Sequence, residues 1–159
     1  MARPIGNRLP PELVRALDGA DLGGKLGLAY PLITVDASGA PRLSMLSAGE
    51  LLARDDSSVR IALWPDTRTG DNLARGAEVL LCCITTGSVL YVRGRSRRLV
   101  AAHDAGVQCF EVAVTAVETD AHEGMPVTSG ITFAPVDPAP EAVLASWQGQ
   151  LAALAKAHD

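Results

Sequence analysis

A polar cluster of Thr67, Arg68 and Thr69 follows the apolar segment SSVRIALW and precedes a short helical pattern around Asn72. Backbone N–H groups at the start of a helix have no partner within the helix and favour an anion. Two threonine hydroxyls would add hydrogen-bond donors, and an arginine guanidinium can bind two phosphate oxygens at once. These residue types fit a phosphate site. They fit equally a surface helix that is capped by Thr69 or Asp71, with Arg68 in solvent.

No other part of the sequence has the pattern of a known catalytic site. The histidines stand far from one another and from the cysteines, and we expect no metal ligand or general base among His103, His122 and His158. The cysteines lack metal-binding spacing, so reduced core thiols are expected at Cys82, Cys83 and Cys109. We therefore predict no catalytic side chain and no metal site.

The composition sets the class of protein. A chain of 159 residues, 48% hydrophobic and 20% charged, predicts one globular domain over residues 1–159. A net charge of −4 argues against nucleic acid or an anionic membrane as the main partner. The sequence has neither a signal-peptide pattern nor an apolar run of membrane-spanning length, so we expect a cytoplasmic protein.

The segments around the polar cluster are typical of strands. A helix is expected at about 10–18, where Pro11 suits a first turn and Gly19 a C-terminal stop. A hairpin follows, with Gly39 in its turn, and the unbroken apolar run AEVLLCCITT predicts a strand covered on both faces. The expected strands are the two of the hairpin 27–48, then 57–64, 77–86, 87–100 and 107–119. Six strands with few helices predict an antiparallel barrel or sandwich at about 25–135.

The fifth strand alternates between two faces. One face would contain Val89, Tyr91, Arg93, Arg95 and Arg97, and the other would contain Leu90, Val92, Gly94 and Ser96. We expect the arginines to form a solvated face rather than an RNA-binding surface, with Glu111 of the next strand pairing across the sheet.

A terminal helix is expected at about 139–157. Its apolar residues recur at three- and four-residue steps and form one stripe of Leu144, Trp147, Leu151 and Leu154. We expect this stripe to offer a surface that a dimer could bury.

The order of these segments resembles the flavin-binding split-barrel family of pyridoxamine 5'-phosphate oxidase. The shared features are a D-x-x-G-x-P turn, an S/T-x-K/T helix start followed by an N-L pair, and a strand that ends in Y-x-x-G. In this chain they are Asp36, Gly39 and Pro41, then Thr67 to Thr69 with Asn72 and Leu73, and then Tyr91 and Gly94. The resemblance covers about residues 25–118.

The resemblance implies a mainly β (α+β) fold, a six-stranded antiparallel split β-barrel with short flanking helices and a C-terminal helix. It also implies a homodimer with one FMN in each of two clefts at the subunit interface. By position, Thr67, Arg68 and Thr69 would hold the phosphate, at the helix start that includes Asn72. Trp64 would meet the flavin at a strand end, and the strand beside the isoalloxazine ring would contribute Ser44, Met45, Leu46 and Ser47.

The sequence departs from the oxidase at important positions. The oxidase has an arginine near the position of Ser44 and a lysine at that of Thr69, and its C-terminal arginine–histidine substrate motif is replaced here by the terminal helix. We therefore expect an FMN-binding, flavin-dependent oxidoreductase with an unidentified small-molecule substrate, and not pyridoxamine 5'-phosphate oxidase activity itself.

Binding without turnover is the alternative. The same cleft could hold flavin, haem or the deazaflavin F420 in a non-catalytic protein. Haem would need His103 or His122 as an axial ligand, and F420 would need a basic groove made by Arg93, Arg95 and Arg97. A barrel that binds single-stranded nucleic acid would need exposed aromatic residues in a basic groove, and the sequence does not have them.

Overall fold

The computed structural model describes residues 2–102, 105–136 and 139–159. Its helices are α1 (Pro11–Ala16), α2 (Arg68–Ala74) and α3 (Pro140–Lys156), with two 3-10 turns, η1 (Gly23–Lys25) and η2 (Ala48–Glu50). Its strands are β1 (Arg3–Gly6), β2 (Ala29–Val35), β3 (Pro41–Ser47), β4 (Leu51–Ala53), β5 (Ser58–Leu63), β6 (Glu78–Thr85), β7 (Ser88–Leu99) and β8 (Gln108–Thr119).

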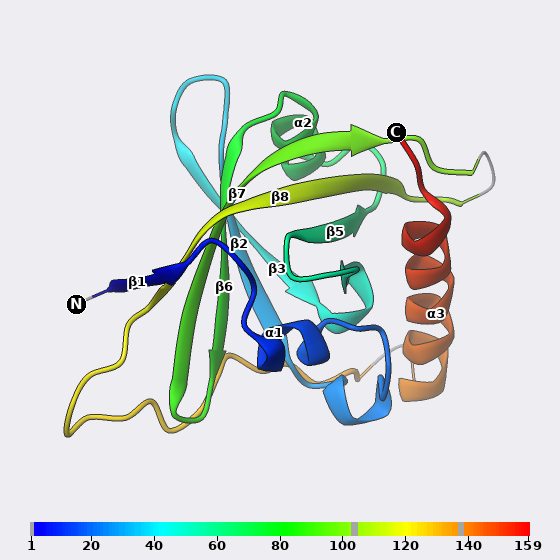
Figure 1. Cartoon of the computed structure of the whole chain (residues 1–159). Helices are drawn as coiled ribbons and strands as arrows, with labels where there is room; N and C mark the ends of the chain where they lie inside the picture. The colour runs from blue at the N-terminus through cyan, green and yellow to red at the C-terminus, as the bar shows by residue number, and fades with distance from the viewer. Residues whose placement is uncertain (1, 103–104, 137–138) are drawn as a thin grey trace.

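All the strands belong to one antiparallel sheet that curls into a half-barrel (Figure 1). The order of the strands across the sheet is β3-β2-β6-β7-β8-β5-β4, and β1 pairs with the C-terminal end of β8. The predicted mainly β antiparallel fold with a C-terminal helix is confirmed. The predicted number of six strands was low, because β1 and β4 have only four and three residues and are too short to show alternation.

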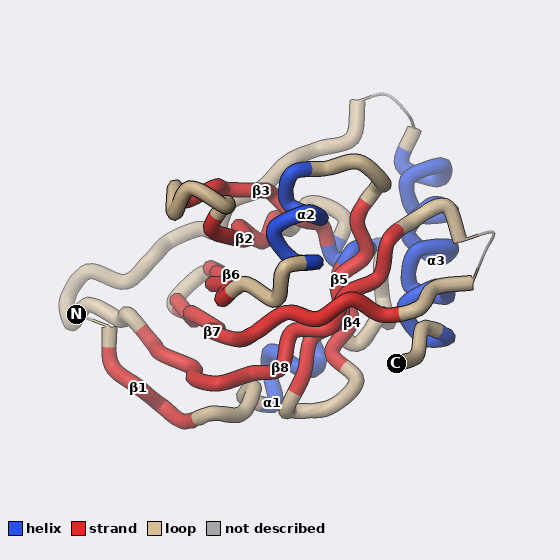
Figure 2. Tube along the Cα trace, turned by 90° about the horizontal axis from the view of Figure 1, so that it is seen from above, coloured by secondary structure: helices blue, strands red, loops and turns tan. Residues whose placement is uncertain are grey.

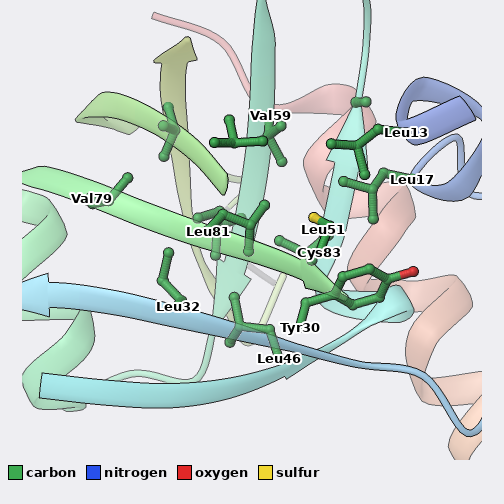
Figure 3. Packing of buried hydrophobic residues seen from close by; sticks show 14 of the residues in the cluster. Leu13, Leu17, Tyr30, Leu32, Leu46, Leu51, Val59, Val79, Leu81 and Cys83 are labelled. Atoms are coloured by element: carbon green, nitrogen blue, oxygen red, sulfur yellow. The ribbon is translucent and has the colours of Figure 1, made fainter. Parts of the chain in front are cut away.

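The strand register separates an inner face from an outer face. Leu32, Leu81, Val92 and Val117 lie side by side on β2, β6, β7 and β8, and all are buried. Figure 3 shows this inner face packing with Leu13 of α1 and with Leu17, the residue that follows α1. The side chains of the adjacent residue in each strand point outward, because successive side chains of a strand alternate between the two faces of the sheet. The outer row contains Ile33, Leu80, Arg93 and Ala116.

Helix α2 covers one end of the half-barrel, with the sheet curling around it (Figure 2). The β2–β3 hairpin turns at Gly39 as predicted, and the φ of +87° at this residue lies in the left-handed region that favours glycine. The oxygen Oδ1 of Asp36 accepts hydrogen bonds from the backbone N–H groups of Ser38 and Ala40 in that turn. Arg75, which follows α2, donates from Nη2 to the carbonyl oxygen of Val35 at 3.1 Å and so holds the hairpin and α2 together at the same end of the sheet.

Helix α3 packs against η2, β4 and β5 of its own chain. Trp147, Leu151 and Leu154 of its apolar stripe are buried there, so the prediction that this stripe serves a dimer is corrected. A Cβ on Gly49 would lie 1.9 Å from Cγ of Trp147, which shows how closely the indole approaches η2. The stripe contributes to the subunit core instead.

The buried Arg60 of β5 fixes the end of α3. Its Nη1 donates to the carbonyl oxygens of Leu154 at 2.5 Å and Ala157 at 2.8 Å. Its Nε donates to Glu111 at 3.3 Å. Carbonyl groups in the last turn of a helix have no partner within the helix, so the guanidinium satisfies them.

The arginines of β7 form the expected ion pairs across the sheet. Arg93 pairs with Glu118 at 3.3 Å and Arg95 with Glu78 at 3.0 Å. Arg97 pairs with Glu111 at 2.5 Å, which confirms the predicted partner, and also contacts Asp159. Within the described residues, no helix has both the length and the hydropathy needed to cross a membrane.

Candidate functional site

The polar cluster lies where β5 leads into α2. Thr67 has extended backbone angles and is the N-cap of α2, and its Oγ1 accepts a hydrogen bond from the backbone N–H of Gly70 at 3.1 Å. The cap is therefore Thr67 and not Thr69 or Asp71, the two residues considered from the sequence. Its hydroxyl hydrogen is not used by this bond and can still be donated.

Thr69 is directed inward from the first turn of α2. Its Oγ1 lies 2.6 Å from Oγ of Ser44 on β3, and either hydroxyl can be the donor. Thr69 is buried, whereas Ser44 is half-buried. Because two hydroxyls that share one hydrogen bond retain one unused O–H, the pair still offers a donor. Ser44 and Thr69, two of the residues selected from the sequence, are thus in direct contact.

Asn72 is committed to holding α2 on the sheet. Its Nδ2 donates to Oγ1 of Thr34 at 2.9 Å, and its Oδ1 accepts from Nη2 of Arg75 at 2.7 Å. Asn72 and Thr34 are both buried. Asn72 therefore supports the candidate site by positioning the helix that contains Thr67 to Thr69.

Arg68 is the first residue of α2 and is exposed. Among the residues that the structure describes, none makes an ion pair or a hydrogen bond with the Arg68 side chain. It lines a shallow hollow of about 340 Å³ together with Asp36, Asp71 and Arg75. A guanidinium without a protein partner at this point can bind an external anion.

The four candidate residues of β3 alternate between the faces of the sheet. Leu46 is buried in the core, and Met45 lies on the outer face with 42% of its surface exposed. Ser44 faces Thr69, and Ser47 is buried beside η2. Because β3 is at the edge of the sheet, half of its backbone N–H and C=O groups point away from β2. Such groups could contact the polar edge of a planar ligand.

The end of β3 opens into a pocket of about 210 Å³ between η2, the end of β5 and α3. Ser47 and Trp64, two residues selected from the sequence, both line it. Ser47 donates to Oε2 of Glu50 from its backbone N at 2.7 Å and from Oγ at 2.8 Å. Burial raises the pKa of the Glu50 carboxyl, against the lowering effect of these bonds.

Sequence reasoning missed Glu50 and Gln150, which line this pocket, and Arg60, which fixes the end of α3. A signal existed for Glu50, because serine followed by glutamate three residues later is the pattern of a capping box. Gln150 and Arg60 gave no such signal. Their roles depend on contacts between α3 and elements about 90 residues earlier in the chain.

Of the two histidines considered as haem ligands, the structure describes only His122, which lies outside this site. His122 lies in the loop after β8, with 63% of its side chain exposed, and His103 falls outside the described residues. No group of three metal-binding side chains occurs within the ranges that the structure describes.

The chain is 31% identical over 147 residues to the uncharacterized protein YclD of Bacillus subtilis, a match that covers 91% of this chain and 94% of YclD. The two proteins belong to one family. No protein-family model matches the sequence.

Solved structures have the same fold as this YclD-family chain. A provisionally assigned pyridoxamine 5'-phosphate oxidase of Lactobacillus delbrueckii superposes with a TM-score of 0.58 and 19% identity, over 74% of this chain and 98% of the other. HupZ of Group A Streptococcus superposes with a TM-score of 0.54 and 13% identity, over 79% of this chain and 99% of HupZ. An FMN-binding protein of Syntrophomonas wolfei superposes with a TM-score of 0.51 and 13% identity, over 74% of this chain and 87% of the other. These likenesses confirm the fold that the resemblance to the split-barrel family implied.

Proposed function

We propose that this protein binds FMN along β3 and acts as a flavin-dependent oxidoreductase. The observation that carries the proposal is the contact between Ser44 and Thr69, which joins the middle of β3 to the start of α2. Ser47 lies three residues farther along the same strand, in a pocket that it shares with Trp64. At the usual rise of a strand this is about 10 Å, comparable with the separation of phosphate and ring in FMN.

The donor groups at the start of α2 fit a phosphate. Arg68 supplies a cation without a protein partner, Thr67 retains a hydroxyl hydrogen, and the Ser44–Thr69 pair retains another. The flavin, when bound, supplies the electron or hydride transfer, and the protein supplies position and a partly dry surface. Asn72 contributes indirectly, because its bond to Thr34 fixes the orientation of α2.

The proposal includes a homodimer with the cofactor at the subunit interface. The outer face of the β2–β3 hairpin leaves three large apolar side chains partly exposed, Val35 at 40%, Leu43 at 60% and Met45 at 42%. An apolar patch of this kind on a sheet edge is typical of an interface. It borders the same strand that would lie beside the flavin.

Specific observations favour flavin over the other ligands of such a cleft. A haem would need an axial ligand, and His122 is in an exposed loop outside the candidate site. An F420 tail would need a free basic groove, but Arg93, Arg95 and Arg97 are each paired with a carboxylate.

The test is the visible spectrum of the purified protein, followed by titration with FMN. A flavin spectrum that persists through gel filtration, or saturable quenching of FMN fluorescence, supports the proposal. A Soret band would identify a haem protein. A colourless protein that does not bind added FMN would refute the cofactor assignment, and light scattering tests the dimer separately.

A further inference from the structure

The pocket at the end of β3 contains groups that the proposed cofactor does not use. It is lined by Ser47, Glu50, Trp64, Ser146, Trp147 and Gln150, among others. Among the residues that the structure describes, Glu50 is the one ionisable residue in its lining. A carboxylate that is half-buried without a cation is costly, so the pocket is electrostatically incomplete.

The carboxyl of Glu50 has a fixed orientation. Both the backbone N and Oγ of Ser47 donate to its oxygen Oε2, at 2.7 and 2.8 Å. Within the described part of the chain, no hydrogen bond reaches the other oxygen, Oε1. One oxygen is thus anchored and the other is left to accept a bond from a ligand.

A second acceptor comes from α3. Gln150 is only 6% exposed, and its Oε1 has no hydrogen-bond partner among the described residues. Buried carbonyl oxygens normally have a partner, and leaving one unpaired costs free energy. The oxygen is closed to solvent as the side chain stands, so a ligand donor would satisfy it once the amide turns toward the pocket.

The two indoles provide aromatic surfaces beside these acceptors. Trp64 has 55% of its surface exposed, whereas Trp147 is 6% exposed and packs closely on Gly49. A large indole that remains in solvent next to a carboxylate is a favourable neighbour for an organic cation, because the ring face attracts positive charge.

We propose that this pocket binds a small primary amine in its ammonium form. Its N–H groups would donate to Glu50 Oε1 and Gln150 Oε1, and its apolar part would lie against Trp64. The inference rests on the proposed function in one respect: Ser47 and Trp64 also belong to the proposed flavin site, so a bound amine would lie at the ring end as the substrate. The binding itself requires only residues of this chain.

Intrinsic fluorescence reports this pocket directly, because the only two tryptophans of the sequence are Trp64 and Trp147. The probe is benzylamine at about pH 7, where it is an ammonium ion. Benzyl alcohol is its neutral counterpart, and benzyltrimethylammonium retains the charge without an N–H donor. We expect saturable binding of benzylamine, with both other compounds about tenfold to hundredfold weaker.

Glu50→Gln keeps an acceptor for Ser47 and removes the charge. We expect it to weaken the binding of benzylamine by the same factor of about tenfold to hundredfold. Glu78→Gln, which removes an exposed carboxylate on β6, should change nothing and serves as the matched control. Equal affinity for benzylamine and benzyl alcohol in the unaltered protein would overturn the proposal, whether or not Glu50→Gln folds. An unchanged affinity in folded Glu50→Gln would overturn it as well.

The titrations are made with and without FMN to separate this inference from the cofactor assignment. If the protein binds benzylamine but not FMN, the amine site is supported and the flavin assignment is refuted. If it binds FMN but not benzylamine, the flavin assignment is supported and the amine site is refuted.

Discussion

The hydroxyl oxygens of Ser44 on β3 and Thr69 on α2 lie 2.6 Å apart and share a hydrogen bond. Both members of this pair are neutral. A neutral pair can coexist in contact without a phosphate between its members, whereas two cations could not. The phosphate end of the proposed site is therefore preorganised by hydroxyls, with Arg68 as its source of positive charge.

The Ser44–Thr69 bond predicts energetic coupling between the two residues. In a double-mutant cycle of Ser44→Ala and Thr69→Val, we expect a coupling free energy of about 1 kcal/mol in urea unfolding, because each single change leaves the other hydroxyl without its partner. Strictly additive effects would mean that the two hydroxyls do not interact in solution.

Arg68→Ala should weaken the binding of FMN and not that of riboflavin. The guanidinium has no protein partner among the described residues, so its loss should leave the fold intact. We expect the dissociation constant for FMN to rise about tenfold to hundredfold, whereas riboflavin, which lacks the phosphate, should bind as before.

The matched control for Arg68 is Arg95→Ala, which removes an exposed arginine paired with Glu78 on the outer face of the sheet. It should leave both affinities unchanged. If Arg68→Ala weakened riboflavin as much as FMN, Arg68 would support structure and not the phosphate.

Leu43→Glu tests the proposed dimer face. Leu43 is 60% exposed on the outer face of β3, so the substitution should change the stability of the subunit by less than about 0.5 kcal/mol. A charge in an apolar interface is costly, so we expect light scattering to shift from dimer to monomer. Val100→Glu, at a side chain with 54% exposure at the end of β7, is the control and should remain dimeric. A persistent dimer of Leu43→Glu would place the interface elsewhere.

The elements that strong local patterns define could be predicted from the sequence. The hairpin around Gly39, the alternation of β7 and the periodic α3 all follow from side-chain spacing. The pairing of Arg97 with Glu111 could be anticipated because these residues lie on successive strands. The short β1 and β4 could not be predicted, because their pairing comes from tertiary contact.

The candidate site was less accessible to sequence reasoning. Residue types identified Thr67 to Thr69 as one cluster, but they did not show that Thr67 is the cap or that Thr69 is turned inward to Ser44. The stripe of α3 was recognised correctly as apolar, yet periodicity does not say what covers a face. The pocket of Glu50 and Gln150 arises only when α3 packs on η2.

Tyr30→Phe should stabilise the protein. The Tyr30 side chain is 3% exposed, and its hydroxyl has no hydrogen-bond partner in the described part of the chain. Burial raises the pKa of Tyr30 to about 12, as expected for a phenol in an apolar environment. Removing the hydroxyl should raise the free energy of unfolding by about 1 kcal/mol. Tyr91→Phe is the control and should cause no gain, because the Tyr91 hydroxyl bonds Asp120 at 3.3 Å.

The raised pKa of Glu50 predicts how stability changes with pH. Because burial raises this pKa in the folded protein, the folded state binds the proton more tightly than the unfolded state. The free energy of unfolding should therefore fall as pH rises from about 4.3, the ordinary pKa of a glutamate, through the raised value. Glu50→Gln cannot titrate, so thermal unfolding should show its stability relative to the unaltered protein increasing over that range. A pH profile of Glu50→Gln that runs parallel to that of the unaltered protein would mean that burial does not penalise the carboxylate. Added benzylamine should diminish the difference, because an ammonium ion beside Glu50 favours the ionised carboxylate.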